Sequence, residues 1–300
     1  AKKHLKDVSG EGQKTSSKLG SFFSGIGKGA AVVGKATMIG LSAAATGITA
    51  LGTMAVKSYA DYEQLVGGIE TLFGTRGAKS VEEYAEMVGK SVKDVEAEFG
   101  MLQEAQKLAM DNAAKAYQTA GLSANEYMET ANSLAAALNQ SSASQLESAE
   151  LADQAIIDMS DNANKMGTSM EAIQNAYNGF SKQNFTMLDN LKLGYGGTKE
   201  EMQRLLDDAG KIAGTKFDIS SFADITEAIH VMQEEMGIAG TTHREATETI
   251  QGSLSMLKGS WSNLMTGLSD PEADLDKLIN NVFESVTVVA SNLVPRITQV

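Results

Sequence analysis

Residues 144–167, SQLESAELADQAIIDMSDNANKMG, show in one stretch the pattern that decides the fold. Ser144 and Glu147 have the spacing of a capping box, in which a hydroxyl and a carboxylate satisfy the free amides at a helix start. Gly167 supplies a stop signal. Between them, small and apolar residues recur every three or four positions, which predicts an amphipathic helix; they are Ala149, Ala152, Ile156, Met159, Ala163 and Met166.

The same pattern recurs along the chain. Further capping boxes are Ser80/Glu83, Ser123/Glu126, Thr168/Glu171, Thr198/Glu201 and Thr242/Glu245, and Asp270 before Pro271 predicts another helix start. Apolar stripes continue beyond residue 220, and their helix-packing candidates are Ile225, Ile229, Leu254, Leu257, Trp261 and Leu264. With Ile156 and Met159 these residues predict an all-α protein, built as an elongated array of amphipathic helices.

Composition excludes several classes of site. The 300 residues include two prolines and no cysteine, so disulfides, thiolate metal sites and cysteine nucleophiles are absent from the chain. Residues 1–60 carry eight lysines against Asp7 and Glu11, a net charge of +6. Because the whole chain has a net charge of −13, residues 61–300 carry a net charge of −19. That acidic remainder argues against specific nucleic-acid binding, which needs clustered Lys and Arg.

Residues 36–56 form an uncharged run of 21 residues that is long enough, as a helix, to cross a membrane. Small residues let helices approach closely, so the run also suits self-association. The candidates for membrane contact or self-association are Gly40, Ala44, Gly47 and Gly52, with the larger Ile39, Leu41, Ile48 and Leu51. The run is only marginally hydrophobic, which would let it stay soluble before it inserts into a membrane.

The chain therefore divides into four predicted parts. Residues 1–29 are a basic, flexible segment, and 30–60 a Gly/Ala-rich hydrophobic helix of membrane-spanning length. Residues 61–269 form the main helical domain. Residues 270–300 begin a further amphipathic helix, which we expect to continue beyond Val300 because no closing glycine follows.

Two glycine motifs resemble nucleotide-binding loops without completing them. Residues 29–36 end in Ala36, where a phosphate-binding loop needs Ser or Thr to hold magnesium. Residues 25–30 imitate a dinucleotide-binding motif, but the acidic residue expected about 20 positions later is absent. His230 and Glu234 lie one helical turn apart, but the chain has three histidines in all, so we interpret them as a solvated helix edge. We predict no cofactor, no metal and no catalytic residue.

Four stretches resemble the N-terminal conserved region of tail tape-measure proteins from long-tailed bacteriophages and prophages. They are ADYEQLVGGIETLFG (60–74), AGLSANEYMET (120–130), DMSDNANKMGT (158–168, continuing through IQNAY, 173–177) and FTMLDNLKLGYGGTKEEM (185–202). With EAIH (227–230), the likeness spans about residues 56–300. The acidic stretch 81–110 departs from the pattern and reads as an insertion.

The resemblance implies a structural protein without enzymatic activity. It would lie as a small helical bundle of copies in the lumen of the tail tube, where chain length sets tube length. Its implied partners are the tail-tube protein, tail assembly chaperones and distal tail or baseplate hub proteins, and on infection the host membrane, which the genome crosses. One alternative is a membrane-active pore-forming or toxin-like protein, although such proteins usually have two adjacent apolar spans. A tail-associated hydrolase finds no catalytic pair in this chain.

Overall fold

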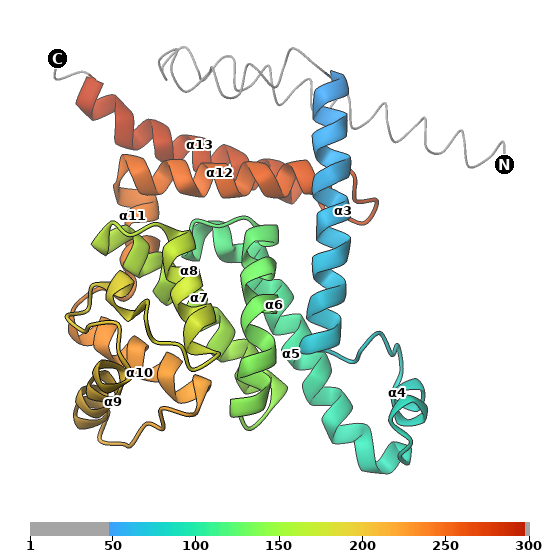
Figure 1. The fold of residues 1–300 in the computed structure, drawn as a ribbon. Coiled ribbons are helices and arrows are strands. Elements are labelled where there is room, and N and C mark those ends of the chain that lie inside the picture. Colours follow the sequence, from blue (N-terminus) through green and yellow to red (C-terminus); the bar gives the residue numbers. More distant parts are fainter. Residues whose placement is uncertain (1–47, 298–300) are drawn as a thin grey trace.

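The computed structural model describes the backbone of residues 48–297 and the side chains of residues 54–294. Within that range the chain forms eleven α-helices and one 3₁₀ helix, with no strand (Figure 1). In order they are α3 (Ile48–Leu72), α4 (Val81–Val88), α5 (Val92–Thr119), α6 (Ala124–Ser141), α7 (Gln145–Met166), α8 (Met170–Phe180), η1 (Leu188–Leu191), α9 (Lys199–Ala213), α10 (Phe222–Glu235), α11 (Thr241–Glu248), α12 (Ile250–Gly267) and α13 (Leu275–Ile297). The all-α prediction is confirmed for these residues.

Several predicted helix starts are present. At α6 the Ser123 hydroxyl accepts from the Glu126 amide while the Glu126 carboxylate accepts from the Ser123 amide, a complete capping box. Ser80, Ser144 and Thr198 each accept the corresponding amide at the start of α4, α7 and α9. Gly167 ends α7 in the left-handed conformation, with φ of 68°.

Three predicted starts are wrong. Helix α8 is capped one residue later by Ser169, because Thr168 donates its hydroxyl to the Asn190 carbonyl instead. Helix α11 follows Gly240 without a side-chain cap. Helix α13 begins four residues after Pro271, where the Asp274 carboxylate accepts from the Lys277 amide.

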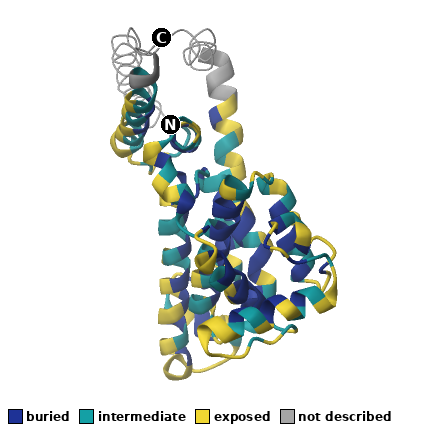
Figure 2. Cartoon of the chain, turned by 90° about the vertical axis from the view of Figure 1, so that its left-hand side faces the viewer, coloured by how far each residue is buried: buried dark blue, intermediate teal, exposed yellow. Residues whose placement is uncertain are grey.

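The apolar stripes of the helices pack together in one shared core and are not spread along an extended array. One cluster of buried side chains joins α3, α5, α6, α7, α8, η1, α9 and α10, and Figure 2 shows these residues gathered in the centre of the body. Its largest fully buried members include Tyr127, Tyr177, Phe73 and Phe180. The described helices therefore do not form the elongated array that we expected. Short turns bring consecutive stripes face to face within one chain.

Helices α3 and α6 are joined by a ladder of asparagine side chains. Asn125, Asn132 and Asn139 donate from Nδ2 to the carbonyls of Ser58, Leu65 and Leu72, at 2.9, 3.1 and 2.7 Å. Every pair is separated by 67 residues, so the two helices run parallel in one register. A seven-residue repeat on both partners is the spacing of a coiled coil. We call these three contacts the asparagine ladder.

The close approach of α3 and α6 depends on Gly68. A Cβ at this position would lie 2.3 Å from Asn132 Nδ2 and 2.8 Å from its Cγ. The neighbouring Gly67, also in α3, would place a Cβ with nothing within 4 Å. Only the second glycine of the Gly67-Gly68 pair is therefore required by packing.

Helices α12 and α13 form a hairpin above this body, joined by residues 268–274 (Figure 1). Buried Leu257, Leu264, Met265, Val282 and Val289 hold the two helices together. The hairpin is attached to the body through the Asn263 Oδ1, which accepts from the Ala124 amide at 2.8 Å. The expected boundary at 269/270 thus falls within one packed hairpin, and the one at 60/61 falls inside α3.

Gly68→Ala should lower the free energy of unfolding by about 1–2 kcal/mol, because the new Cβ displaces Asn132 from the Leu65 carbonyl. Gly67→Ala is the matched control and should raise it by up to about 1 kcal/mol through helix propensity. Urea unfolding of both variants measures the difference. Equal effects of the two substitutions would contradict the packing role of Gly68.

Candidate functional site

The predicted membrane or self-association run lies only partly within the described chain. Ile39, Gly40, Leu41, Ala44 and Gly47 fall outside the described residues. Ile48, Leu51 and Gly52 belong to the first turns of α3. No helix in the described part of the chain is both long enough and apolar enough to cross a membrane.

The end of this run lies on a part of α3 that has both exposed and buried residues. Met54 and Val56 are 59% and 63% exposed, whereas Ala55 between them is buried. Figure 2 shows this part of α3 standing clear of the main body. Two large apolar side chains of the run are therefore accessible on this part of α3.

Below that point α3 is fastened by polar contacts at a junction of three helices. The Ser58 hydroxyl lies 2.6 Å from the Thr266 hydroxyl of α12, and the Ser58 carbonyl accepts from Asn125 of α6. Tyr59 and Tyr62 stack with ring centroids 6.1 Å apart. The position and direction of the exposed apolar end are therefore set by α6 and α12. We call Met54, Val56 and the α3 turns that carry them the projecting apolar end.

The helix-packing candidates lie in two clusters. Ile156, Met159, Ile225 and Ile229 are fully buried in the main core. In the α12–α13 hairpin Leu264 and Leu257 are buried, and Trp261 packs against them while partly exposed.

Leu254 departs from its predicted stripe, since it is 37% exposed. Gly252, two residues earlier, packs so closely on α11 that a Cβ would lie 2.1 Å from the Glu245 carbonyl oxygen. Residues two apart point to nearly opposite sides of a helix. The contact at Gly252 therefore turns Leu254 outward.

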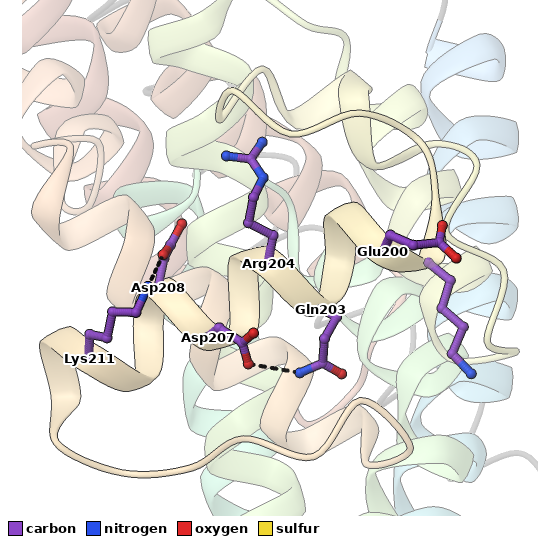
Figure 3. Close-up of a pocket in the computed structure, with 7 residues that line it drawn as sticks. Glu200, Gln203, Arg204, Asp207, Asp208 and Lys211 are labelled. Carbon is purple, nitrogen blue, oxygen red and sulfur yellow. Dashed lines mark hydrogen bonds and ion pairs between the residues drawn. The ribbon is translucent and has the colours of Figure 1, made fainter.

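A shallow depression of about 420 Å³ follows one face of α9 (Figure 3). Its lining comes from this helix alone. Lys211 forms an ion pair with Asp208 at 2.8 Å, and the Gln203 amide donates to the Asp207 carboxylate at 3.0 Å. Arg204 pairs with Glu201 and lies 4.4 Å from the centre of the Tyr195 ring. Exposed pairs of this kind contribute little stability, and we interpret the face as a solvated helix surface.

The glycine loop before α9 has no free anion-binding amide at Gly196, because this amide donates to the Glu201 carboxylate at 3.1 Å. The Thr198 amide donates to the Gly196 carbonyl. This loop is an interhelical turn that caps its own helix.

His230 is not a solvated helix edge, contrary to our interpretation of the sequence. Its Nδ1 lies 2.9 and 3.0 Å from the two carboxylate oxygens of Asp158, whose side chain is 1% exposed. Burial raises the pKa of Asp158 to about 6, and the hydrogen bond to Asp158 raises the pKa of His230 above its usual value. Asp158 lies 72 residues away in sequence, so no local spacing could reveal this pair.

Asp161, one turn beyond Asp158, holds the start of α11. Its carboxylate accepts from the Gly240 amide at 2.5 Å and from the Thr242 amide at 2.7 Å. Thr242, which we predicted to cap α11 with its side chain, instead donates its backbone amide to Asp161 of α7. In the described part of the chain no group of three or more acidic, His or Cys residues could hold a metal ion.

Leu257→Ala should lower the free energy of unfolding by about 2–4 kcal/mol, because it opens a cavity in the α12–α13 hairpin. Leu254→Ala, the same change one turn earlier at an exposed position, should cost less than about 1 kcal/mol. Chemical unfolding of the two variants provides the comparison. A larger loss for Leu254→Ala would contradict the packing described for α12.

Comparisons with known proteins identify no relative. No protein-family model matches the chain, and no curated protein and no solved structure matches it. The resemblance to tape-measure proteins remains a prediction from the four stretches that carry it.

Proposed function

We propose that this chain is a structural tail protein of a long-tailed phage, a tape-measure component that sets tail length and scaffolds assembly of the tail tube. It would lie in the tube lumen with other copies of itself. Its partners would be the tail-tube protein, the assembly chaperones and the distal tail or hub proteins. After ejection it would assist passage of the genome across the host membrane.

The projecting apolar end carries this proposal. Met54 and Val56 are exposed on a helix whose other end is locked to α6 by the asparagine ladder. A rigid helix thus presents the end of the 36–56 run away from the folded body. Such a display suits contact with a second copy of the chain, or with lipid after release.

The elongated array belongs to the proposed form inside the tube. Helices give a ruler a nearly constant rise of about 1.5 Å per residue. To extend, the chain must uncover the apolar stripes of its shared core, and neighbouring copies would cover them in turn. The closed arrangement described above would then be the form of the chain outside the tail.

A pore-forming or toxin-like protein is the second candidate, and the same exposed Met54 and Val56 favour it. The two functions differ in what chain length controls. A tape measure sets a tube length, whereas a pore former acts on membranes without a tube.

Deleting residues 81–100, most of the satellite cluster around Tyr84 and Phe99, should shorten the assembled tube by about 30 Å. The test expresses the tail genes of the source phage with this variant and measures tube length by electron microscopy. Tyr84→Ala with Phe99→Ala is the control, since it weakens the same cluster at constant chain length. Tubes of unchanged length in the deletion variant would contradict the ruler function.

Deleting residues 30–56 should abolish binding to anionic liposomes, because it removes the apolar run together with Lys35. Flotation with vesicles measures the binding, and circular dichroism checks that the remaining helices fold. Met54→Ser with Val56→Ser should give an intermediate loss. If the deletion variant binds as tightly as the intact chain, the membrane role of this run is wrong.

A further inference from the structure

Two carboxylates one turn apart on α7 hold the two helices that follow α9. Asp158 binds His230 of α10, and Asp161 binds the amides of Gly240 and Thr242 at the start of α11. Helix α11 in turn packs on α12, where a Cβ on Gly252 would meet the Glu245 carbonyl. Residues 158–161 therefore supply polar contacts to both α10 and α11, in addition to the apolar packing of α10 in the shared core.

The charges at this junction are unbalanced. Asp158 and Asp161 face it from α7, and Glu234 faces it from α10, with its Oε1 3.5 Å from His230 Nε2. Tyr177 of α8 lies against Asp158, fully buried. His230 is the cation that these acidic groups act upon, and its side chain is 28% exposed, so a proton can reach it from water.

Helices α10 and α8 also carry buried polar atoms without a hydrogen-bond partner among the described residues. Both amide atoms of Gln233 and the Tyr177 hydroxyl are in this state, and both residues are fully buried. Unpaired buried polar groups cost free energy. Together with the apolar packing of α10, the contacts through Asp158 and Asp161 offset part of that cost.

We propose that Asp158, Asp161 and His230 form a proton-operated latch, which keeps α10 and α11 on α7 while His230 is protonated and loosens when the proton leaves. The latch does not depend on the proposed tail function. Without its second ring proton, His230 can still donate from Nδ1 to Asp158, but its positive charge is lost. The buried Asp158 carboxylate then lies near Asp161 and Glu234 without a cation, and opening lets water reach it.

The direction in which pH changes the opening of the latch follows from His230 and Asp158. The closed form binds the His230 proton more tightly than the open form does, because the closed junction raises its pKa. The pKa of Asp158 is raised as well, from 3.8 to about 6. Opening therefore becomes easier as pH rises from about 4 to beyond the raised pKa of His230, by up to about tenfold per pH unit for each group while it titrates.

Hydrogen exchange with mass spectrometry tests the latch on the full chain between about pH 5 and pH 8, the range in which histidine titrates. After correction for intrinsic exchange rates, peptides covering 222–248 should lose protection as pH rises, while peptides covering 105–117 of α5 should not. Asp158→Asn keeps the oxygen acceptor and removes the charge, so it should make the protection of 222–248 nearly independent of pH. His243→Gln, which changes an exposed histidine of α11, should behave like the unaltered chain.

The ring signals of the histidines provide a second measurement if Asp158→Asn fails to fold. In the unaltered chain His230 should titrate above the usual pKa of about 6.5. Protection of 222–248 that does not change with pH, or a His230 that titrates at or below its usual value, would overturn the latch. An equal effect of His243→Gln on protection would also overturn it.

Discussion

The asparagine ladder between α3 and α6 is the contact on which the arrangement of the other helices depends. Its three side chains bind backbone carbonyls, which lie at fixed intervals along a helix, so a shift of α3 by one residue would break all three bonds together. The register of α3 places Ser58 opposite Thr266, and through it the α12–α13 hairpin. It also decides which residues of the apolar run leave the body. Apolar packing alone would specify that register less sharply.

Polar contacts of the same kind recur wherever elements distant in sequence meet. Asn162 of α7 donates to the Leu191 carbonyl, Asn263 of α12 caps α6, and Asp161 caps α11. Several of these amides keep an unpaired oxygen: the Oδ1 atoms of Asn125, Asn132, Asn139 and Asn162 have no partner among the described residues. Such contacts contribute little net free energy but exclude other packings. The apolar core supplies most of the stability, and the asparagines and aspartates select the arrangement.

Local signals in the sequence predicted the helices and most of their starts, because a capping box acts within four residues. They failed where a distant group competed: the Asn190 carbonyl takes the Thr168 hydroxyl, and Asp161 takes the Thr242 amide. The ladder and the Asp158–His230 pair link residues 67 and 72 positions apart, beyond the reach of periodicity. The shared core could not be predicted from the sequence for a related reason. An amphipathic stripe shows that a partner surface exists, but not whether this surface belongs to the same chain or to another copy.

That ambiguity bears on the proposed function. In a tail tube, the apolar stripes of α5, α7 and α10 would pack against neighbouring copies instead of against each other. The same stripes would then be covered in the closed and in the extended form, so the free energy difference between these two forms would stay small. The apolar surface must remain covered in either state, because exposing it to water is costly. The ladder and the junction at Asp158 are different, since water can replace their hydrogen bonds at little net cost. The change from the closed to the extended form would therefore be governed by the supply of neighbouring stripes, and the polar contacts would decide only where the closed form first opens.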